Sequence, residues 1–586
     1  MTDQTNTAQT NTGQTNTEQL NTGQIRPVAN GWRTGSFRPR LWTWSWFLWT
    51  AFFMLPLASG WILKLVFDRL ETNESVNGLL VAIGVTEVVR WIIFGAGVYF
   101  VVRWWVAALS MMRTNMLFAQ TVSGGPKAGK LPGSPAESIT RFNDDTRDTV
   151  LWTDSWVDGA GNLLYAFGAL AIMSTINRGA ALVVIVPLVV VTIIARKLTP
   201  RLYAARSADR KAGSQVSSFL GEVFSGQLAF RLAGREEAAV KRLERYTSVR
   251  HKTAVRDTVL QQAIEGIASS TGDITIGLTL LVLVPSVRSG EFSVGDLALF
   301  VAYAVPLGEL PRYVARLITS REQAIVSYGR LGQLVAPDRP DDLLEHNEVT
   351  IEPNDTMRRR DPDPDRVPLV HLNVRGLTAR YTDAASVQTG GVSDIDLDVT
   401  AGSFTIITGG VGAGKTTLLR AIVGLIPISE GSVTWNDEPI DDLAAWFVPP
   451  NCAHLPQIPR LFSESLADNV LLGRDDHNLA SVLDLTSLSY DLGAMPDDID
   501  TMVGARGLRL SGGQAQRVAT ARSLLTTPEL LIVDDLSSAL DVATERELWL
   551  QLRKTTSTTI IAVSHRRLAI DQADQVITLE AGRILQ

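Results

Sequence analysis

The segment GGVGAGKT at residues 409–416 combines four glycines with a lysine and a threonine. It follows the β-branched run FTIIT (404–408) and precedes the helical pattern TTLLRAIVGL (416–425). This spacing fits G-x-x-x-x-G-K-[ST], in which backbone N–H groups of a glycine-rich loop surround phosphates, the lysine reaches the outer phosphates and the hydroxyl binds Mg²⁺. The predicted nucleotide-binding residues of this segment are Gly409, Gly410, Val411, Gly412, Ala413, Gly414, Lys415, Thr416 and Thr417.

A second segment with chemical potential is LSGGQAQR at 510–517. Its serine and two glycines open a predicted helix, so they present a hydroxyl and free backbone donors at the positive end of that helix. This arrangement suits an anion, although the pattern alone also fits an ordinary helix start. The residues concerned are Leu510, Ser511, Gly512, Gly513 and Gln514.

The elements that must position these residues alternate in type after residue 369. Short β-branched runs such as 404–408, 530–533 and 559–564 alternate with helical stretches. This alternation predicts an α/β domain with a mostly parallel sheet covered by helices.

The first half of the chain has a different pattern. Six apolar segments lie near 43–66, 83–108, 151–175, 180–198, 262–286 and 293–317. A helix needs about 20 apolar residues to cross a hydrocarbon core, so we expect an all-α transmembrane domain of six helices with long, charged helical extensions between them. Basic residues gather before the first segment, after the second, after the fourth and after the sixth, which predicts that both termini are cytoplasmic.

Two polar stretches mark domain boundaries. QTNT recurs every five residues from Gln4, and such a tract predicts a disordered tail over 1–40. The stretch 337–368 is rich in Pro, Asp and Arg and reads as a linker. The predicted division is therefore a tail at 1–40, a transmembrane domain at 41–336, a linker at 337–368 and an α/β nucleotide-binding domain at 369–586.

Composition excludes several classes of protein. The formal net charge of the 586 residues is −7, which argues against a nucleic-acid binder. The chain has one cysteine, Cys452, so it can form neither an internal disulfide nor a thiolate metal cluster by itself.

With the signature at 510–514, the sequence resembles the ATP-binding cassette (ABC) proteins, and the membrane half resembles the exporter type of that superfamily. The resemblance covers about 41–586 and implies a half-transporter, with six helices fused to one cassette. It also implies that the signature faces ATP held by the glycine-rich loop of a second chain. One departure is Ala505, where the family commonly has Glu in the stretch before the signature.

Other family motifs follow in the same order, and their roles are implied by the resemblance. Tyr381 resembles the aromatic residue that stacks on adenine, and Gln457 resembles the glutamine that contacts Mg²⁺ and the attacking water. Asp534 matches the metal-binding carboxylate, and His565 matches the switch histidine. The D-loop would be Ser538, Ala539, Leu540 and Asp541. The expected Mg²⁺ ligands are thus Thr416, Gln457 and Asp534, with ATP as the nucleotide.

Asp535 stands where the family has the Glu that polarises the attacking water. Aspartate keeps the charge but is one methylene shorter, and a displacement of about 1 Å can lower a rate on the order of a hundredfold. General-base action requires hydrogen-bond contact with the water. We therefore expect ATP binding with slow hydrolysis at this chain's own site, where Asp535, Gln457 and His565 would be the catalytic residues.

The intact signature favours a heterodimer, in which this chain completes a competent site on a second half-transporter. A homodimer with two slow sites remains the alternative. The expected activity is ATP-driven export of a small amphipathic, lipid or peptide-like substrate across the cytoplasmic membrane of a bacterium. An importer with the exporter fold, handling a siderophore-like substrate, and an ATP-gated channel or sensor are the other readings. Asp273 and Glu309 lie within apolar segments, where charges are costly, so both are candidate substrate contacts.

Overall fold

The computed structural model describes residues 26–122, 135–288, 292–335, 340–347, 365–382, 388–475, 477–504, 510–536, 542–555 and 557–585. By the density of its internal contacts the chain divides into two compact units. One comprises Met1–Ala119 and Leu131–Met357, and the other comprises Gln120–Lys130 and Arg358–Gln586.

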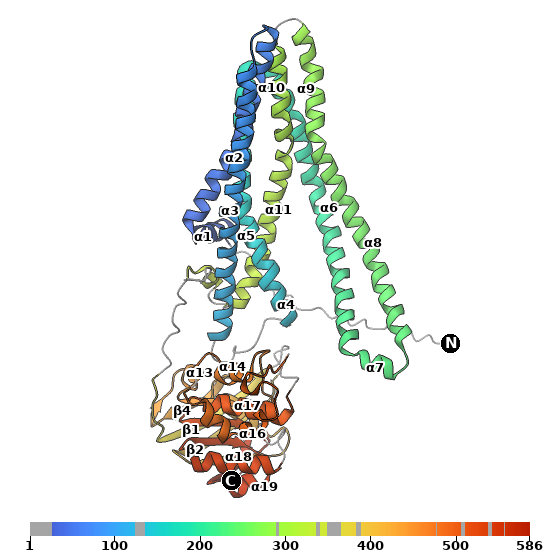
Figure 1. The fold of residues 1–586 in the computed structure, drawn as a ribbon. Coiled ribbons are helices and arrows are strands. Elements are labelled where there is room, and N and C mark those ends of the chain that lie inside the picture. The colour runs from blue at the N-terminus through green and yellow to red at the C-terminus, as the bar shows by residue number, and fades with distance from the viewer. Residues whose placement is uncertain are drawn as a thin grey trace, which may run out of the picture. The chain divides into compact units, whose positions relative to one another are not determined.

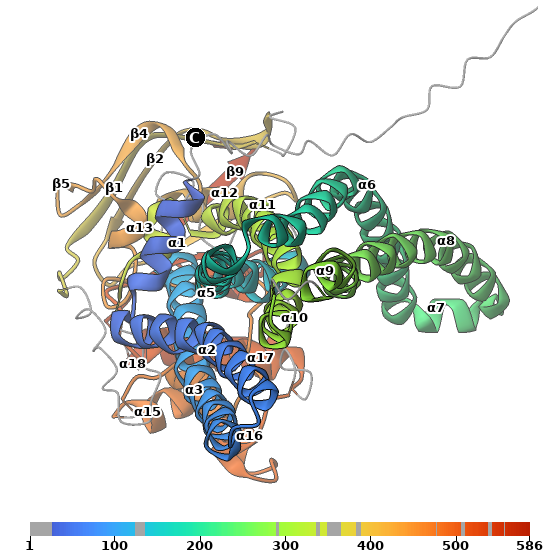
Figure 2. The same ribbon diagram turned by 90° about the horizontal axis from the view of Figure 1, so that it is seen from above.

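The first unit is helical throughout its described residues (Figure 1). Its helices are α1 (Pro27–Ser36), α2 (Pro39–Glu71), α3 (Asn77–Val122), α4 (Pro135–Thr140), the π-helical turn η3 (Arg141–Asp145), α5 (Thr146–Ile176), α6 (Arg178–Ser225), α7 (Gln227–Leu232), α8 (Glu236–Ser269), α9 (Thr271–Arg288), α10 (Val294–Gly308), α11 (Leu310–Val335) and the 3₁₀ turn η4 (Pro340–Leu344). The short helix α7 joins α6 to α8, which lie side by side in both views (Figures 1 and 2).

Within the described residues, five helical stretches are long and apolar enough to cross a membrane. They are Pro39–Glu71, Asn77–Thr121, Ser138–Ile176, Ala181–Phe224 and Val294–Val335. The segment predicted at 262–286 is not among them; it spans the end of α8 and most of the apolar helix α9, which are separated at Ser270. Large apolar side chains such as Val81, Trp91 and Ile92 are more than 60% exposed on α3, as expected of a surface that faces lipid.

The predicted tail proves too long, because residues 27–36 form α1. Pro27 occupies the first turn, where its missing N–H is no loss. The helix packs on α5 and α11: the Trp152 indole donates to the Pro27 carbonyl at 3.0 Å, and the hydroxyls of Thr34 and Tyr328 are 3.1 Å apart. The repeat-bearing residues before 26 lie outside the described residues.

The predicted linker likewise begins too early. Residues 340–347 fold onto the first unit, where Leu343 and Leu344 are 2% exposed in a core with Trp104 and Met111. The amide of Asn115 donates to the carbonyls of Leu343 and Glu345 at 3.0 and 2.9 Å.

The second unit contains two sheets. A four-stranded antiparallel sheet has the order β2-β1-β4-β5, which the sequence reading did not anticipate, and a six-stranded sheet has the order β10-β9-β3-β8-β7-β6. In the second sheet every pairing is parallel except that of β10 with β9, which confirms the predicted α/β class. The strands are β1 (His371–Thr382), β2 (Gln388–Thr400), β3 (Phe404–Gly409), β4 (Ile428–Trp435), β5 (Glu438–Pro439), β6 (Cys452–Leu455), β7 (Leu530–Asp534), β8 (Thr559–Val563), β9 (Gln575–Glu580) and β10 (Arg583–Ile584).

Helices cover the six-stranded sheet, and Figure 2 shows β1, β2, β4 and β5 on one side of this unit, away from α15, α16 and α18. The apolar runs of β7 and β8 are buried along their whole length, as expected of central strands in a parallel sheet. The helices of this unit are α12 (Lys415–Ile422), α13 (Leu443–Trp446), α14 (Leu466–Leu471), α15 (Leu479–Leu485), α16 (Leu488–Leu492), η5 (Asp498–Asp500), α17 (Gly512–Leu524), α18 (Val542–Thr555) and α19 (Arg567–Asp571).

Candidate nucleotide site

The glycine-rich loop joins the buried strand β3 to α12, and its backbone requires glycine at two points. Gly409 has φ +143°, and a Cβ there would lie 2.1 Å from the Leu579 carbonyl oxygen. Gly414 has φ +99°, and a Cβ there would lie 2.8 Å from Val392 Cγ1. Because both positions exclude side chains, the backbone of the loop is held close to β9 and β2. Val411 is fully exposed on the loop.

Lys415 and Thr416 begin α12, and their side chains bond to different partners: Lys415 to the loop itself and Thr416 to the end of β7. The Lys415 ammonium donates to the carbonyls of Gly409 and Gly410 at 2.9 and 2.8 Å, and the Thr416 hydroxyl donates to Asp534 Oδ1 at 3.0 Å. Burial lowers the pKa of Lys415 against the opposing influence of Asp535 and Asp534. Burial also raises the pKa of Asp534, against the hydrogen bond from Thr416. A lysine, a hydroxyl and a carboxylate thus converge beside a loop of backbone donors, which fits a phosphate chain with Mg²⁺.

Asp535 and Gln457 meet at the carboxyl ends of neighbouring strands β7 and β6. The Gln457 amide donates to Asp535 Oδ2 at 3.4 Å. Asp535 has φ +52°, a left-handed conformation in which Asp and Asn are several-fold enriched among non-glycine residues. His565 is exposed on the loop after β8, the strand between β3 and β7.

The signature segment begins α17 with a reciprocal cap. Gln514 N donates to the Ser511 hydroxyl at 3.2 Å, and Ser511 N donates to Gln514 Oε1 at 2.9 Å. The Gln514 amide also donates to Asp491 of α16 at 3.2 Å, and Arg517 forms an ion pair with the same carboxylate. Asp491 therefore anchors the start of α17. Sequence reading missed this residue, because α16 has only five residues and carries no periodic pattern.

Several predicted site residues cannot be placed in full. Tyr381 lies near the end of β1, paired in register with Gly390, but its side chain is outside the described part of the structure. Ala505 and the D-loop residues Ser538, Ala539, Leu540 and Asp541 lie outside the described residues.

The two candidate substrate contacts in the membrane helices differ in their surroundings. Asp273 is exposed in the first turn of α9. Glu309 follows α10 and lies 2.5 Å from the Arg312 guanidinium, so its charge is compensated. Sequence reading passed over Glu87 of α3, which accepts a hydrogen bond from the Ser59 hydroxyl at 2.8 Å and lies 3.3 Å from Arg90.

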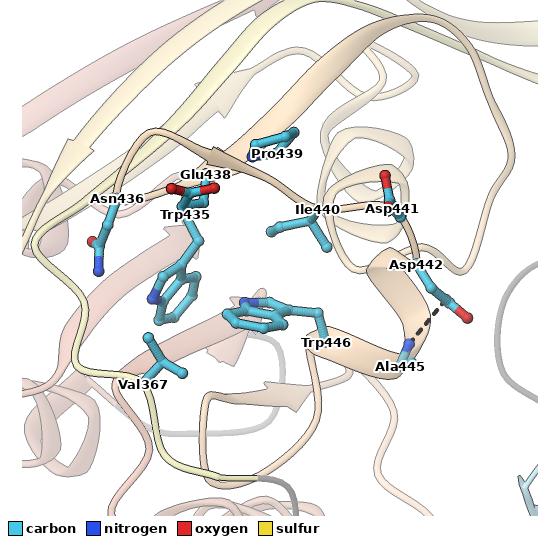
Figure 3. Close-up of a pocket in the computed structure, with 10 residues that line it drawn as sticks. All are labelled: Val367, Trp435, Asn436, Glu438, Pro439, Ile440, Asp441, Asp442, Ala445 and Trp446. Carbon is cyan, nitrogen blue, oxygen red and sulfur yellow. Dashed lines mark hydrogen bonds between the residues drawn. The ribbon is translucent and has the colours of Figure 1, made fainter.

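A separate pocket of about 470 Å³ lies on the antiparallel sheet (Figure 3). The indoles of Trp435 and Trp446 project into the middle of the view, and Asp442 accepts a hydrogen bond from Ala445 N at 3.1 Å. None of the predicted nucleotide-site residues lines this pocket.

Comparison with known proteins agrees with this geometry. Residues 133–307 match the family model described as ABC transporter transmembrane region, and residues 392–538 match the family model described as ABC transporter. Together the two matches take in more than half of the chain. The chain is therefore an ABC transporter of the exporter type, a half-transporter with one transmembrane region fused to one nucleotide-binding domain.

Individual relatives are distant. The chain is 24% identical to the ATP-dependent lipid A-core flippase of Bordetella avium over 82% of its own length and 79% of the relative. It is 26% identical to the mesentericin-Y105 transport/processing ATP-binding protein MesD of Leuconostoc mesenteroides over 64% of its length and 50% of the relative. A solved structure of a bacterial Atm1-family ABC exporter with ATP bound has the same fold, with a TM-score of 0.72 at 20% identity over 91% of this chain and 94% of that one.

Proposed function

We propose that this chain is one subunit of an ATP-driven exporter of the cell membrane, with its own ATP site slow in hydrolysis. Both termini and the nucleotide-binding domain lie on the cytoplasmic side, because the basic residues of the membrane half gather on the connections that share that side. Export also agrees with the exporter fold and with the names of the relatives described above.

In the proposed site, the loop 409–414 and Lys415 bind the phosphates of ATP, and Tyr381 stacks on the adenine. Thr416, Asp534 and Gln457 hold Mg²⁺, which neutralises phosphate charge when bound. The signature at 510–514 and the D-loop at 538–541 serve ATP bound by the second chain.

The observation that carries the slow-site proposal is the position of Asp535. Its carboxylate is within 3.4 Å of Gln457, so it faces the proposed metal site. The aspartate side chain is one methylene shorter than that of glutamate, and the left-handed backbone suits Asp better than Glu. ATP binding does not depend on this residue, because Lys415, Thr416 and Asp534 are in place.

A weak site beside a complete signature supports a heterodimer, in which the second chain supplies a glutamate after its own metal-binding aspartate. The substrate is proposed to be amphipathic, either a lipid or a peptide, because the relatives are named for a lipid A-core and for mesentericin. Asp273 is the stronger of the two candidate contacts, since Glu309 is paired with Arg312.

The test replaces Asp535 by Glu in the purified chain, reconstituted in lipid. We expect kcat for ATP to rise about tenfold, and the affinity for ATP to change by less than twofold, because only the reach of the base has changed. Asp535→Asn, which removes the base, should lower kcat below that of the unmodified chain and serves as the matched control. An unchanged kcat in Asp535→Glu would show that reach does not limit this site.

The subunit arrangement and direction need two further measurements. A chain purified alone that shows strong substrate-stimulated ATPase activity, lost in Asp535→Ala, would contradict the heterodimer and favour the homodimer. ATP-dependent accumulation of substrate in inverted vesicles is expected for export. Substrate loss from preloaded inverted vesicles would indicate import, and ion current without accumulation would indicate a channel.

A further inference from the structure

Glu545 is a buried carboxylate outside the predicted site. It lies in the first turn of α18 and is 1% exposed. Its Oε2 atom is 2.6 Å from Arg566 Nη1, and its Oε1 atom accepts a hydrogen bond from the Trp549 indole at 3.3 Å. Both oxygens are therefore engaged, as a buried carboxylate requires.

The helix that carries Glu545 is fixed to the core of the sheet. Trp549 is fully buried, and its ring centroid lies 5.0 Å from that of Phe404 on β3. Leu548 and Leu552 are each 1% exposed in the same core. Glu545 is consequently held by a rigid support rather than by a mobile loop.

Arg566, the partner of Glu545, directly follows His565. On the other side of the histidine, Ser564 is 1% exposed and its N–H donates to the Ile407 carbonyl at 3.3 Å. The N–H of Arg566 in turn donates to the Ser564 hydroxyl at 3.2 Å. His565 is thus exposed between Ser564, which is bonded to β3, and Arg566, which is bonded to Ser564 and to Glu545 of α18.

The charge of Asp535 reaches this ion pair. Burial raises the pKa of Glu545, the Trp549 hydrogen bond and Arg566 oppose that rise, and Asp535 adds to it. Removing one partner of such a buried pair leaves an uncompensated charge, which the surrounding loop must move to solvate.

We propose that Glu545 is a positioning residue for His565, acting through Arg566 to fix the loop after β8. This inference rests on the proposed role of His565 as the switch residue that meets nucleotide. The alternative is an ion pair that merely stabilises the domain.

The first test is a double-mutant cycle in the purified full-length chain, measured as ATP turnover. Glu545→Gln keeps the size of the side chain and removes its charge. We expect kcat to fall about tenfold with KM for ATP changed less than twofold. In a His565→Ala background, Glu545→Gln should cause no further loss, because its effect passes through the histidine. Additive losses would overturn the proposal.

Two variants guard this test. Asp574→Asn removes an acid that pairs with Arg553 of the same helix at 3.1 Å, and its effect on kcat should be below twofold. Arg566→Lys keeps the charge but loses the planar fork, so it should show the same dependence on His565 as Glu545→Gln. If Glu545→Gln does not fold, Arg566→Lys takes its place in the double-mutant cycle with His565→Ala.

The second readout needs no turnover. Modification of His565 by diethylpyrocarbonate, followed by peptide mass spectrometry, should change at least threefold in rate in Glu545→Gln, while Asp574→Asn matches the unmodified sequence. Equal rates in a folded Glu545→Gln protein would contradict the proposal. Failure of the chain to bind ATP would defeat the proposed function, whereas the modification rates decide the role of Glu545 whatever the ATPase activity of the chain alone.

Discussion

At the residue scale, two properties of Asp535 bear on hydrolysis: its left-handed backbone conformation favours aspartate over glutamate, and its side chain is the shorter of the two. A non-glycine residue with φ +52° is uncommon, and Asp is one of the few that adopt this conformation readily. A glutamate introduced there gains reach but loses this local preference. The gain in hydrolysis expected for Asp535→Glu is therefore set at about tenfold, below the roughly hundredfold that a 1 Å displacement alone can cause.

A second residue-scale prediction concerns neighbouring glycines of the phosphate-binding loop. Gly409→Ala should abolish ATP binding and lower the melting temperature of the nucleotide-binding domain, because the new Cβ would lie 2.1 Å from the Leu579 carbonyl oxygen. Gly410→Ala is the matched control: its Cβ would have no neighbour within 4 Å among the described residues, so the fold and Tm should be retained. Equilibrium ATP binding and scanning calorimetry measure both effects. Normal ATP binding by Gly409→Ala would disprove the close approach of the loop to β9.

At the element scale, η4 and α1 are held to the membrane unit by a small polar network. Asn115 of α3 donates to two carbonyls of residues 340–347 and accepts from the Asn347 amide at 3.1 Å. Arg33 of α1 lies 3.1 Å from Asp341, and the His346 ring lies 2.8 Å from the Arg33 carbonyl. Residues 340–347 are thus bonded to the first unit at two residues, Asn115 of α3 and Arg33 of α1.

Asn115→Ala should release this attachment, because the carbonyls of Leu343 and Glu345 lose their donor, and the buried one, that of Leu343, is left unsatisfied at a cost of about 1–3 kcal/mol. The expected result is faster hydrogen exchange and faster proteolysis over 340–347. Asn143→Ala, a change at an exposed asparagine before α5, is the control and should leave both rates unaltered. Unchanged exchange in Asn115→Ala would mean that Leu343 and Leu344 hold the segment by themselves.

How much of this could be predicted differs by element. Apolar runs placed β3, β7 and β8 correctly, and the glycine spacing located the loop before α12, because burial in a parallel sheet leaves a clear apolar signature. Helix α1 was missed since its surroundings are polar, although Pro27, Val28 and Trp32 were a faint signal of a helix start. Glu545 gave no such signal in the sequence. Charged residues that are far apart in the sequence, such as Glu545 and Arg566, resemble ordinary surface residues until the fold shows that they form a buried ion pair.

At the scale of the whole molecule, the longest helices of the membrane unit are longer than a bilayer is thick. Helices α3 and α6 have 46 and 48 residues, so each is about 70 Å long at 1.5 Å per residue. A hydrocarbon core is about 30 Å thick, so more than half of each helix lies outside it. Helical structure thus continues past the apolar segments, to Val122 in α3 and to Ser225 in α6.

Because the chain forms two compact units, acid should affect them separately. Burial, aided by Arg420, lowers the pKa of His454 on β6 to about 4. Between about pH 6.5 and 4, His454 is therefore protonated in the unfolded chain but neutral in the folded domain. Folding stability consequently falls as the pH falls through that window. At pH 5.5 the loss is about 1 kcal/mol.

Scanning calorimetry at pH 7.5 and 5.5 should show this loss in the melting of the nucleotide-binding domain. His454→Leu removes the titrating group, so the acid shift of that transition should shrink while the melting of the membrane unit keeps its own pH dependence. Identical acid shifts in both proteins would assign the effect to other groups.

The cap at the start of α17 complicates any genetic dissection of the signature. The Ser511 hydroxyl already accepts a bond from the backbone of its own helix, and only its hydrogen is left for an outside anion. One oxygen thus serves folding and recognition at once. Ser511→Ala removes both, so a silent transporter with that change would not reveal which was lost; aspartate, which caps a helix equally well but repels phosphate, separates the two duties.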